Sequence, residues 1–315
     1  MKGYGEMDNR NDVVWTRFPV ALLAAFLCCT LWGSAIPAIK AAYRLFQIAE
    51  EDTASKILLA GVRFTLAGLL TILLGSIASK RLIRPKRSSA GKIVILGLTQ
   101  TVGQYFFFFI AVANTSGVRS SLINASGNFL AILFAWWVFR LEKLSLKKLL
   151  GCLVGFSGII LILGGFQALF TGEAIRPEGE GAMLIADVFY ALSVCCIKIF
   201  SRDEDPVALS GYQFVFGGII LSVVGLIMGG RLIFYSGACY ANLIYMGFIS
   251  AGAYTLWGVL LKYNPVSRIA VFGFINPVMS VLLSALILGE NREAFSPTGL
   301  LALVLISLGI IIVNV

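Results

Sequence analysis

The stretch SGVRSSLINASGNFLAILFAWWVFRLEKLSLKKLLG, Ser116–Gly151, decides the fold because the chain contains a second version of it. The second version, NPVSRIAVFGFINPVMSVLLSALILGENREAFSPTG, covers Asn264–Gly299 and aligns with the first 148 residues later without a gap. Few residues are identical, but Asn128 of the first copy falls on Asn276 of the second. The alignment predicts that the chain arose by duplication.

Both copies have the same internal order of features. Each begins with a short turn, continues as an apolar run with a buried Asn at the matching position, ends that run at Glu142 or Glu290, and then enters a second apolar run. We expect the two Glu side chains to cap helices and anchor loops. The Asn128 and Asn276 pair, near the middle of the runs, is the better candidate for the lining of a pathway.

The composition excludes an ordinary soluble protein. The chain has 315 residues, of which 58% are hydrophobic and 13% charged, with a mean hydropathy of +0.90. Apolar runs of 18 or more residues are typical of helices that cross a hydrocarbon layer about 30 Å thick. Ten such runs are present, near residues 18–39, 56–78, 91–113, 118–139, 147–166, 180–200, 207–229, 237–260, 266–288 and 297–315.

The net charge of +9 reflects membrane topology and not nucleic-acid binding. If the N-terminus is inside, 17 of the 25 Lys and Arg residues fall in inside segments and seven in outside segments. The positive-inside rule then places both termini in the cytoplasm. We therefore expect a multi-pass protein of the cell membrane with no nucleic-acid partner.

The second half of the chain repeats the first with its orientation reversed. The sequence GYQFVFGG in the run 207–229 overlays GVRFTLAG in the run 56–78, with Gln213 on Arg63, and Tyr190 overlays Trp32. Five spans per half place the second copy upside down in the membrane. The predicted fold is an all-α membrane protein of ten transmembrane helices in two inverted five-helix repeats. Its expected parts are a cytoplasmic segment 1–17, a first repeat 18–166, an extracellular loop 167–179 and a second repeat 180–315.

Two charged residues lie deep in apolar runs. Arg63 and Asp187 are at similar depth below the predicted outer surface. Ionisable groups in membrane spans mark pathways or pair with one another. An ion pair, a carboxylate whose protonation is coupled to transport, and a purely structural pair are all open interpretations.

Polar and aromatic residues at helical spacing supply the remaining candidates. Amide pairs four residues apart share a helix face and either hold helices together or contact substrate. Pro and Gly interrupt the first span, and Asn276-Pro277 interrupts the ninth, which frees backbone groups at mid-membrane depth. The predicted substrate-binding residues are Trp32, Ser34, Arg63, Gln100, Gln104, Asn124, Asn128, Asp187, Tyr190, Tyr254, Trp257 and Asn276.

Other motifs are either structural or missing. Gly151-x-x-x-Gly155, followed by Gly158, predicts a close helix–helix approach. With six Cys, no C-x-x-C spacing and no His, the sequence predicts neither a metal site nor a disulfide, and no nucleotide-binding loop is present. We expect no cofactor and no catalytic residue.

The sequence resembles the drug/metabolite transporter superfamily, in particular its EamA-type members. The resemblance covers roughly residues 18–315 and rests on LWGSAIPAIK (31–40), RFTLAGLL (63–70), the Glu that ends each repeated run and NPV (276–278). One departure is Ala35, where the family pattern often has Asn. The resemblance implies two repeats of about five helices around a central cavity lined by the first, third, fourth, sixth, eighth and ninth spans. It also implies transport of amino acids, other metabolites or drugs, often outward.

The leading functional hypothesis is a secondary transporter, an exporter of small metabolites such as amino acids or of amphiphilic drugs, that works by alternating access. Its partners would be a small-molecule substrate, membrane lipids and, as one means of driving it, a coupling proton or other ion. An intramembrane enzyme is the alternative, but the chain lacks H-E-x-x-H and any His base. A channel is the other alternative. The sequence does not specify an oligomeric state.

Overall fold

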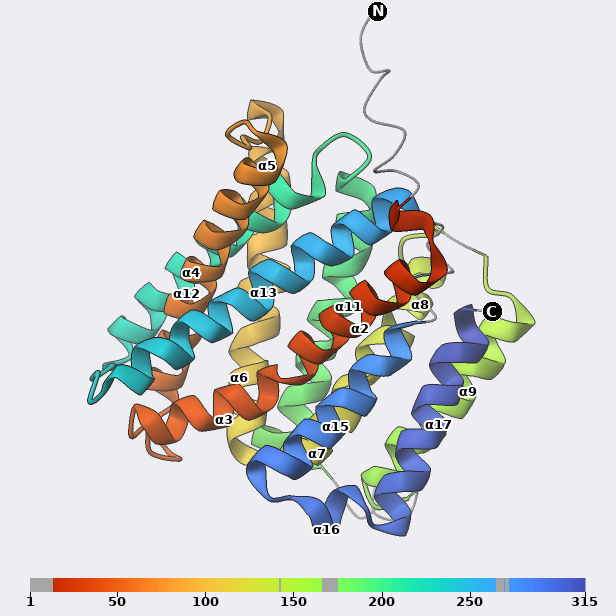
Figure 1. Cartoon of the computed structure of the whole chain (residues 1–315). Helices are drawn as coiled ribbons and strands as arrows, with labels where there is room; N and C mark the ends of the chain where they lie inside the picture. Colours follow the sequence, from red (N-terminus) through yellow and green to blue (C-terminus); the bar gives the residue numbers. More distant parts are fainter. Residues whose placement is uncertain (1–13, 142, 166–174, 265–268, 270–271, 315) are drawn as a thin grey trace, which may run out of the picture.

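Helices form every regular element in the part of the chain that the computed structural model describes, namely residues 14–141, 143–165, 175–264, 269 and 272–314. Figure 1 shows these helices as one bundle. The first half contains α2 (Phe18–Gly33), α3 (Ala35–Leu45), α4 (Thr53–Ser79), η1 (Arg87–Ser89), α5 (Ala90–Leu96), η2 (Gly97–Gln104), α6 (Tyr105–Asn114), α7 (Gly117–Asn124), α8 (Ser126–Trp137) and α9 (Leu146–Ile162). The second half contains η3 (Pro177–Gly181), α11 (Ala182–Phe200), α12 (Pro206–Ile227), α13 (Gly237–Tyr263), η4 (Phe272–Phe274), α15 (Ile275–Leu288), α16 (Asn291–Ala294) and α17 (Pro297–Asn314).

The fold is that of an all-α membrane protein. Five helical stretches are long and apolar enough to cross a membrane: Phe18–Leu45, Thr53–Ser79, Arg87–Asn114, Pro177–Phe200 and Pro206–Ile227. Each predicted apolar run has helix in its described residues, although part of the run 266–288 lies outside them. The ten-span layout in two inverted repeats stays a prediction, which the packing below supports.

Several spans are broken near their middles. Pro37 has no N–H for the carbonyl of Gly33, and the chain bends at Ser34 between α2 and α3. The third span contains the π-helical segment η2, and the fourth is interrupted at Ala125 between α7 and α8. Such breaks are tolerated at membrane depth where the freed backbone groups are buried in protein or face a cavity.

Glycines bring α4 and α12 into backbone contact. A Cβ added to Gly61 would lie 2.2 Å from the backbone N of Ser222, and one added to Gly218 would lie 2.4 Å from that of Thr65. Gly225 meets Leu58 in the same way, so residue numbers rise along one helix as they fall along the other. The two helices are therefore antiparallel, as an inverted repeat requires.

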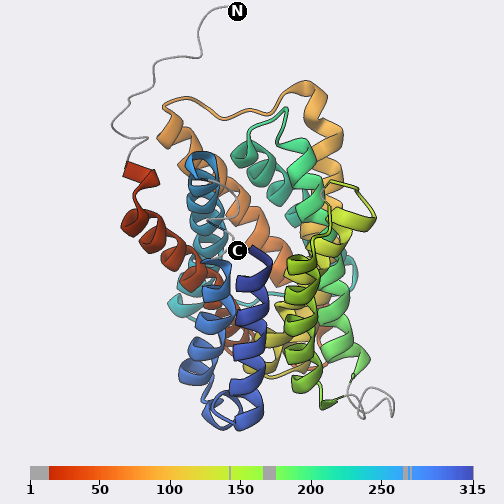
Figure 2. The same ribbon diagram turned by 90° about the vertical axis from the view of Figure 1, so that its right-hand side faces the viewer.

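A second antiparallel pair joins α9 and α17, which lie side by side in both views (Figures 1 and 2). A Cβ on Gly151 would lie 2.8 Å from the carbonyl oxygen of Gly309, and one on Gly158 would lie 2.8 Å from that of Ala302. The close approach predicted for the glycine motif is thus confirmed. Gly155 leaves room for the ring of Phe129 from α8 as well as for the backbone of Gly309.

The bundle has two chemically different ends. The end that holds loop residues 80–89 and 201–205, at the top of Figure 1, carries a cluster of Lys and Arg and is called the basic end below. The opposite end, called the far end, holds residues 46–52 and 289–296. At the basic end, Glu204 accepts hydrogen bonds from the hydroxyl of Ser89 (2.6 Å) and the backbone N–H of Lys86 (2.8 Å), which ties the two loops together.

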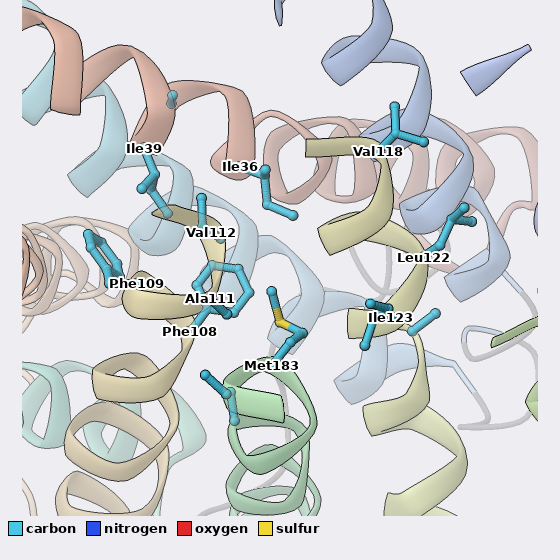
Figure 3. Packing of buried hydrophobic residues seen from close by; sticks show 14 of the residues in the cluster. Ile36, Ile39, Phe108, Phe109, Ala111, Val112, Val118, Leu122, Ile123 and Met183 are labelled. Carbon is cyan, nitrogen blue, oxygen red and sulfur yellow. The ribbon is translucent and has the colours of Figure 1, made fainter. Parts of the chain in front are cut away.

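The far half of the bundle is filled by apolar side chains from α3, α6, α7 and α11 (Figure 3). We call this group the apolar plug. It consists of Ile36, Ile39, Phe108, Phe109, Ala111, Val112, Val118, Leu122, Ile123 and Met183, none of which is more than 6% exposed.

Candidate functional site

A cavity of about 330 Å³ lies between the two halves of the chain. Its walls come from α2, α3, α4, η2, α6, α7, α8, α11, α12, α13, η4 and α15. The volume falls in the range of pockets that bury small ligands. Spans predicted to line a central cavity contribute to it, and so do α4 and α12.

The structure brings ten of the twelve predicted binding residues to this cavity. They are Trp32, Arg63, Gln100, Gln104, Asn124, Asn128, Tyr190, Tyr254, Trp257 and Asn276. Residues that are far apart in the sequence, including the repeat-related Asn128 and Asn276, therefore line the same cavity. Their role in binding substrate remains a prediction.

The other two predicted residues have different surroundings. The hydroxyl of Ser34 is 2.7 Å from that of Tyr245 and 2.7 Å from the carbonyl oxygen of Leu31, at the bend between α2 and α3. The carboxylate of Asp187 accepts a hydrogen bond of 2.6 Å from Ser126 at the start of α8 and is 1% exposed. Neither residue is among the described residues that line the cavity.

Arg63 is buried in the cavity wall and has weak protein partners. Its Nε donates to the carbonyl oxygen of Met246 at 3.3 Å and its Nη2 to the hydroxyl of Ser250 at 3.4 Å. Its Nη1 has no hydrogen-bond partner among the described residues, and the side chain is 2% exposed. The guanidinium also lies 4.9 Å from the ring centroid of Phe64 and 5.9 Å from that of Tyr105, within range of cation–π attraction.

The idea that Arg63 pairs with Asp187 is not supported. The ion pairs found among the described residues do not include them, and each has the separate partners given above. Similar depth in the membrane fixes only one coordinate, and the partners of Arg63 are on α13 whereas that of Asp187 is on α8. Asp187 lies between α11 and α8, where an added Cβ on Gly127 would be 3.2 Å from its Oδ1.

A hydrogen-bonded chain crosses from η2 to the second repeat. Gln213 donates from Nε2 to Oε1 of Gln100 at 2.8 Å and accepts from the hydroxyl of Thr101 at 2.6 Å. Gln100 in turn donates to the hydroxyl of Tyr254 at 3.4 Å. One turn further along, Gln104 is 6% exposed and its Oε1 has no partner among the described residues. Gln100 is thus held by protein, and Gln104 has a free acceptor.

Aromatic rings form the apolar part of the wall. The ring of Trp32 packs against those of Tyr254 and Trp257, with centroid distances of 5.5 and 5.3 Å. Tyr254 is also in edge contact with Phe214 at 5.2 Å. Tyr254 and Trp257 on α13 therefore both contact Trp32 of the first span.

Several residues of the wall were not among the predicted binding residues. Ser121 on α7 and Ser280 on α15 join their hydroxyls at 2.6 Å, and Ser210 and Ser250 also line the cavity. A signal was present for two of them, since Ser121 is three residues before Asn124 and Ser250 four residues before Tyr254, on the same helix faces.

The cavity extends toward the basic end. Ile197 near the end of α11 and Pro206, the exposed first residue of α12, both line it. In the other direction the lining stops at residues such as Ile36 and Phe108, which belong to the apolar plug. The described conformation is therefore closed at the far end.

Glu290 anchors the far end. Its carboxylate accepts hydrogen bonds from the first two backbone N–H groups of α7, those of Gly117 (2.9 Å) and Val118 (2.7 Å). The predicted capping role is confirmed for Glu290. Its counterpart Glu142 lies outside the described residues.

The sequence profile described as the EamA-like transporter family matches residues 19–164 and then again residues 178–315. The chain belongs to the EamA-like transporter family. It is therefore a multi-pass membrane transporter, and the earlier resemblance to the drug/metabolite transporter superfamily is confirmed. The two matched stretches correspond closely to the two predicted repeats.

Curated relatives of this EamA-like transporter also have the names of transporters. It is 28% identical to an uncharacterized transporter of Synechocystis sp., covering 94% of this chain and 89% of that protein. It is 25% identical to a probable amino-acid metabolite efflux pump of Salmonella typhimurium, covering 77% and 81% respectively. A protein solved by crystallography shares the fold, with a TM-score of 0.63, 21% identity, and coverage of 93% of this chain and 96% of that one.

Proposed function

We propose that the chain is a secondary transporter that exports a small amphiphilic metabolite by alternating access, with the cavity as its substrate site. The observation that carries this proposal is a cavity at the junction of the two halves that is continued toward one end and closed at the other by the apolar plug. An alternating-access carrier needs such a one-sided state.

The lining suits a substrate with polar and apolar parts. Amides of Gln104, Asn124 and Asn276 offer donors and acceptors, and the rings of Trp32 and Trp257 offer an apolar surface. A few convergent polar groups in a largely apolar cavity are typical of small-molecule sites. The name of the Salmonella relative, a probable amino-acid metabolite efflux pump, agrees with export of a small metabolite.

The proposed orientation supports the outward direction. If the basic end is cytoplasmic, as the positive-inside rule indicates, the described conformation opens to the cytoplasm and would load substrate there. Both termini would then be cytoplasmic.

Counterflow in proteoliposomes tests the proposal. Vesicles that contain purified protein and a high internal concentration of an unlabelled metabolite should accumulate the labelled metabolite transiently, and the initial rate should saturate. Asn276→Leu should lower that rate at least tenfold, whereas Asn242→Leu, a substitution outside the cavity lining, should not. A flux that rises linearly with concentration and shows no counterflow would identify a channel and overturn the proposal.

A further inference from the structure

Arg63 is the only charged residue among the described residues that line the cavity. The lining that the structure describes contains no Asp, Glu or Lys, and Asp187 is turned toward Ser126 behind Gly127. The cavity wall is therefore electrostatically positive. A buried cation without an acidic partner is costly at membrane depth and in functional sites faces a counter-charge.

The guanidinium of Arg63 has unused donor capacity. A guanidinium carries five N–H groups in a planar fork. Only two hydrogen bonds are made, both longer than 3.2 Å, and Nη1 makes none among the described residues. Planar forks of this kind match carboxylates, which accept two parallel hydrogen bonds.

Aromatic rings fix the orientation of this fork. The guanidinium carbon lies 4.9 Å from the ring centroid of Phe64, 5.9 Å from that of Tyr105 and 5.8 Å from that of Phe109. These rings come from α4 and α6, whereas Met246 and Ser250 come from α13. Three helices thus hold a cation in place without neutralising it.

We propose that Arg63 is the anion-binding subsite of the transporter and that the cavity takes organic carboxylates with an apolar body. The carboxylate binds the free edge of the Arg63 guanidinium, and the apolar body lies against the wall of Trp32, Tyr254 and Trp257. This proposal rests on the proposed function and names its substrate class. An organic anion is favoured over a zwitterion, because the described lining has no carboxylate for an ammonium group, and over an organic cation.

The test is a ligand series with one apolar body on the purified full-length protein in detergent. Phenylacetate, phenylacetamide and 2-phenylethylammonium are compared at constant ionic strength with sodium chloride as the reference, and the unfolding temperature is measured. Phenylacetate should raise the unfolding temperature, the amide should need at least about tenfold higher concentration for the same effect, and the ammonium should be weakest. Equal effects of acid and amide, an effect reproduced by chloride, or no effect of phenylacetate would overturn the proposal.

Variants assign the effect to Arg63. Arg63→Gln should abolish the phenylacetate effect but keep any effect of phenylacetamide. Arg63→Lys, which keeps the charge and loses the fork, should weaken the phenylacetate effect only in part. Arg231→Gln, at an exposed position of the far end, is the charge-matched control and should bind as wild type. An unchanged phenylacetate effect in Arg63→Gln overturns the proposal. If that variant does not fold, the ligand series on the wild type decides.

Flux measurements separate this inference from the proposed function. If phenylacetate binding depends on Arg63 but no carboxylate shows counterflow, the anion subsite is supported and the transport proposal is overturned. Counterflow of a metabolite by a protein whose unfolding temperature does not respond to phenylacetate would support transport and overturn the anion subsite.

Discussion

Glu290 of the second half caps a helix of the first half, since its carboxylate oxygens lie 2.9 Å from the backbone N of Gly117 and 2.7 Å from that of Val118. The residues between α15 and α16 are thereby attached to the start of α7, on the closed side of the cavity. A carboxylate at a helix N-terminus satisfies free N–H groups and interacts favourably with the helix dipole.

Glu290→Gln should lower the free energy of unfolding by about 1–2 kcal/mol, because one oxygen acceptor and the charge are lost. Thermal unfolding in detergent measures this as a lower unfolding temperature. Glu51→Gln, an exposed residue of the same end, is the control and should change little. Equal effects of the two substitutions would contradict the capping role.

Gly218→Ala should destabilise the protein by about 1–3 kcal/mol, since the new methyl group would meet the backbone N of Thr65 at 2.4 Å and the carbonyl oxygen of Gly61 at 2.8 Å. The matched control is Gly91→Ala in α5, where an added Cβ has no neighbour within 4 Å. It should be neutral or stabilising by up to about 1 kcal/mol through helix propensity. If the two substitutions changed the free energy of unfolding by the same sign and amount, backbone contact between α4 and α12 would be contradicted.

Glu204 should contribute stability that depends on pH. Burial raises the pKa of its carboxyl, but hydrogen bonds from Ser89 and from the backbone of Lys86 and Asp205, with the charge of Lys86, outweigh it and leave the pKa below its ordinary value of 4.5. The contribution is complete above the unfolded pKa and is lost as pH falls through the lower folded pKa. The unfolding temperature of wild type should therefore exceed that of Glu204→Gln at pH 7, and the difference should shrink below about pH 4.5. A constant difference would contradict this account.

Arg63→Gln and Asp187→Asn should have additive effects on the free energy of unfolding, within about 0.5 kcal/mol, because the two side chains are not in contact. The pair Asp187→Asn and Ser126→Ala should instead be coupled by about 0.5–3 kcal/mol through the 2.6 Å hydrogen bond. Both double-mutant cycles can be measured by unfolding in detergent. Strong coupling between Arg63 and Asp187 would restore the ion-pair hypothesis.

Thiol labelling should report the one-sided opening. In a background without native cysteines, Ser210→Cys lines the cavity near the basic end and should react with a membrane-impermeant maleimide added from that side. Val112→Cys, fully buried in the apolar plug, should stay unreactive from the far side. The side from which Ser210→Cys reacts also determines which end is cytoplasmic. If Val112→Cys reacted from the far side faster than Ser210→Cys reacts from the basic end, closure by the plug would be contradicted.

Hydrophobic runs were sufficient to predict where the helices lie, and glycine spacing was sufficient to predict that another helix approaches the span of Gly151 closely. Small residues in an apolar helix let another backbone approach, and the structure places the backbone of Gly309 against Gly151. The breaks within the spans were harder to predict. The interruption near Ser34 follows from Pro37, but the π-helical segment η2 and the break at Ala125 have no comparable sequence mark.

The cavity residues were predictable where polar groups lie at membrane depth. A polar group in a membrane span costs free energy, so its presence indicates a partner or a pathway. That rule located Arg63, Gln104 and Asn276 on one cavity. It could not locate Asp187 relative to Arg63, because depth along a helix says nothing about direction around it. Nor could it select Ser210, since hydroxyls in membrane helices so often bond to their own backbone.

The absence of an acidic residue beside Arg63 in the described cavity wall has an electrical consequence. Arg63 stays with the protein, so a bound monoanion would cross the membrane as a net negative charge. Such movement couples to the membrane potential at about 2.3 kcal/mol per 100 mV. A cytoplasm that is negative relative to the outside would by itself drive the anion outward, so this transporter would need no second ion to be an exporter, and its turnover would produce a current.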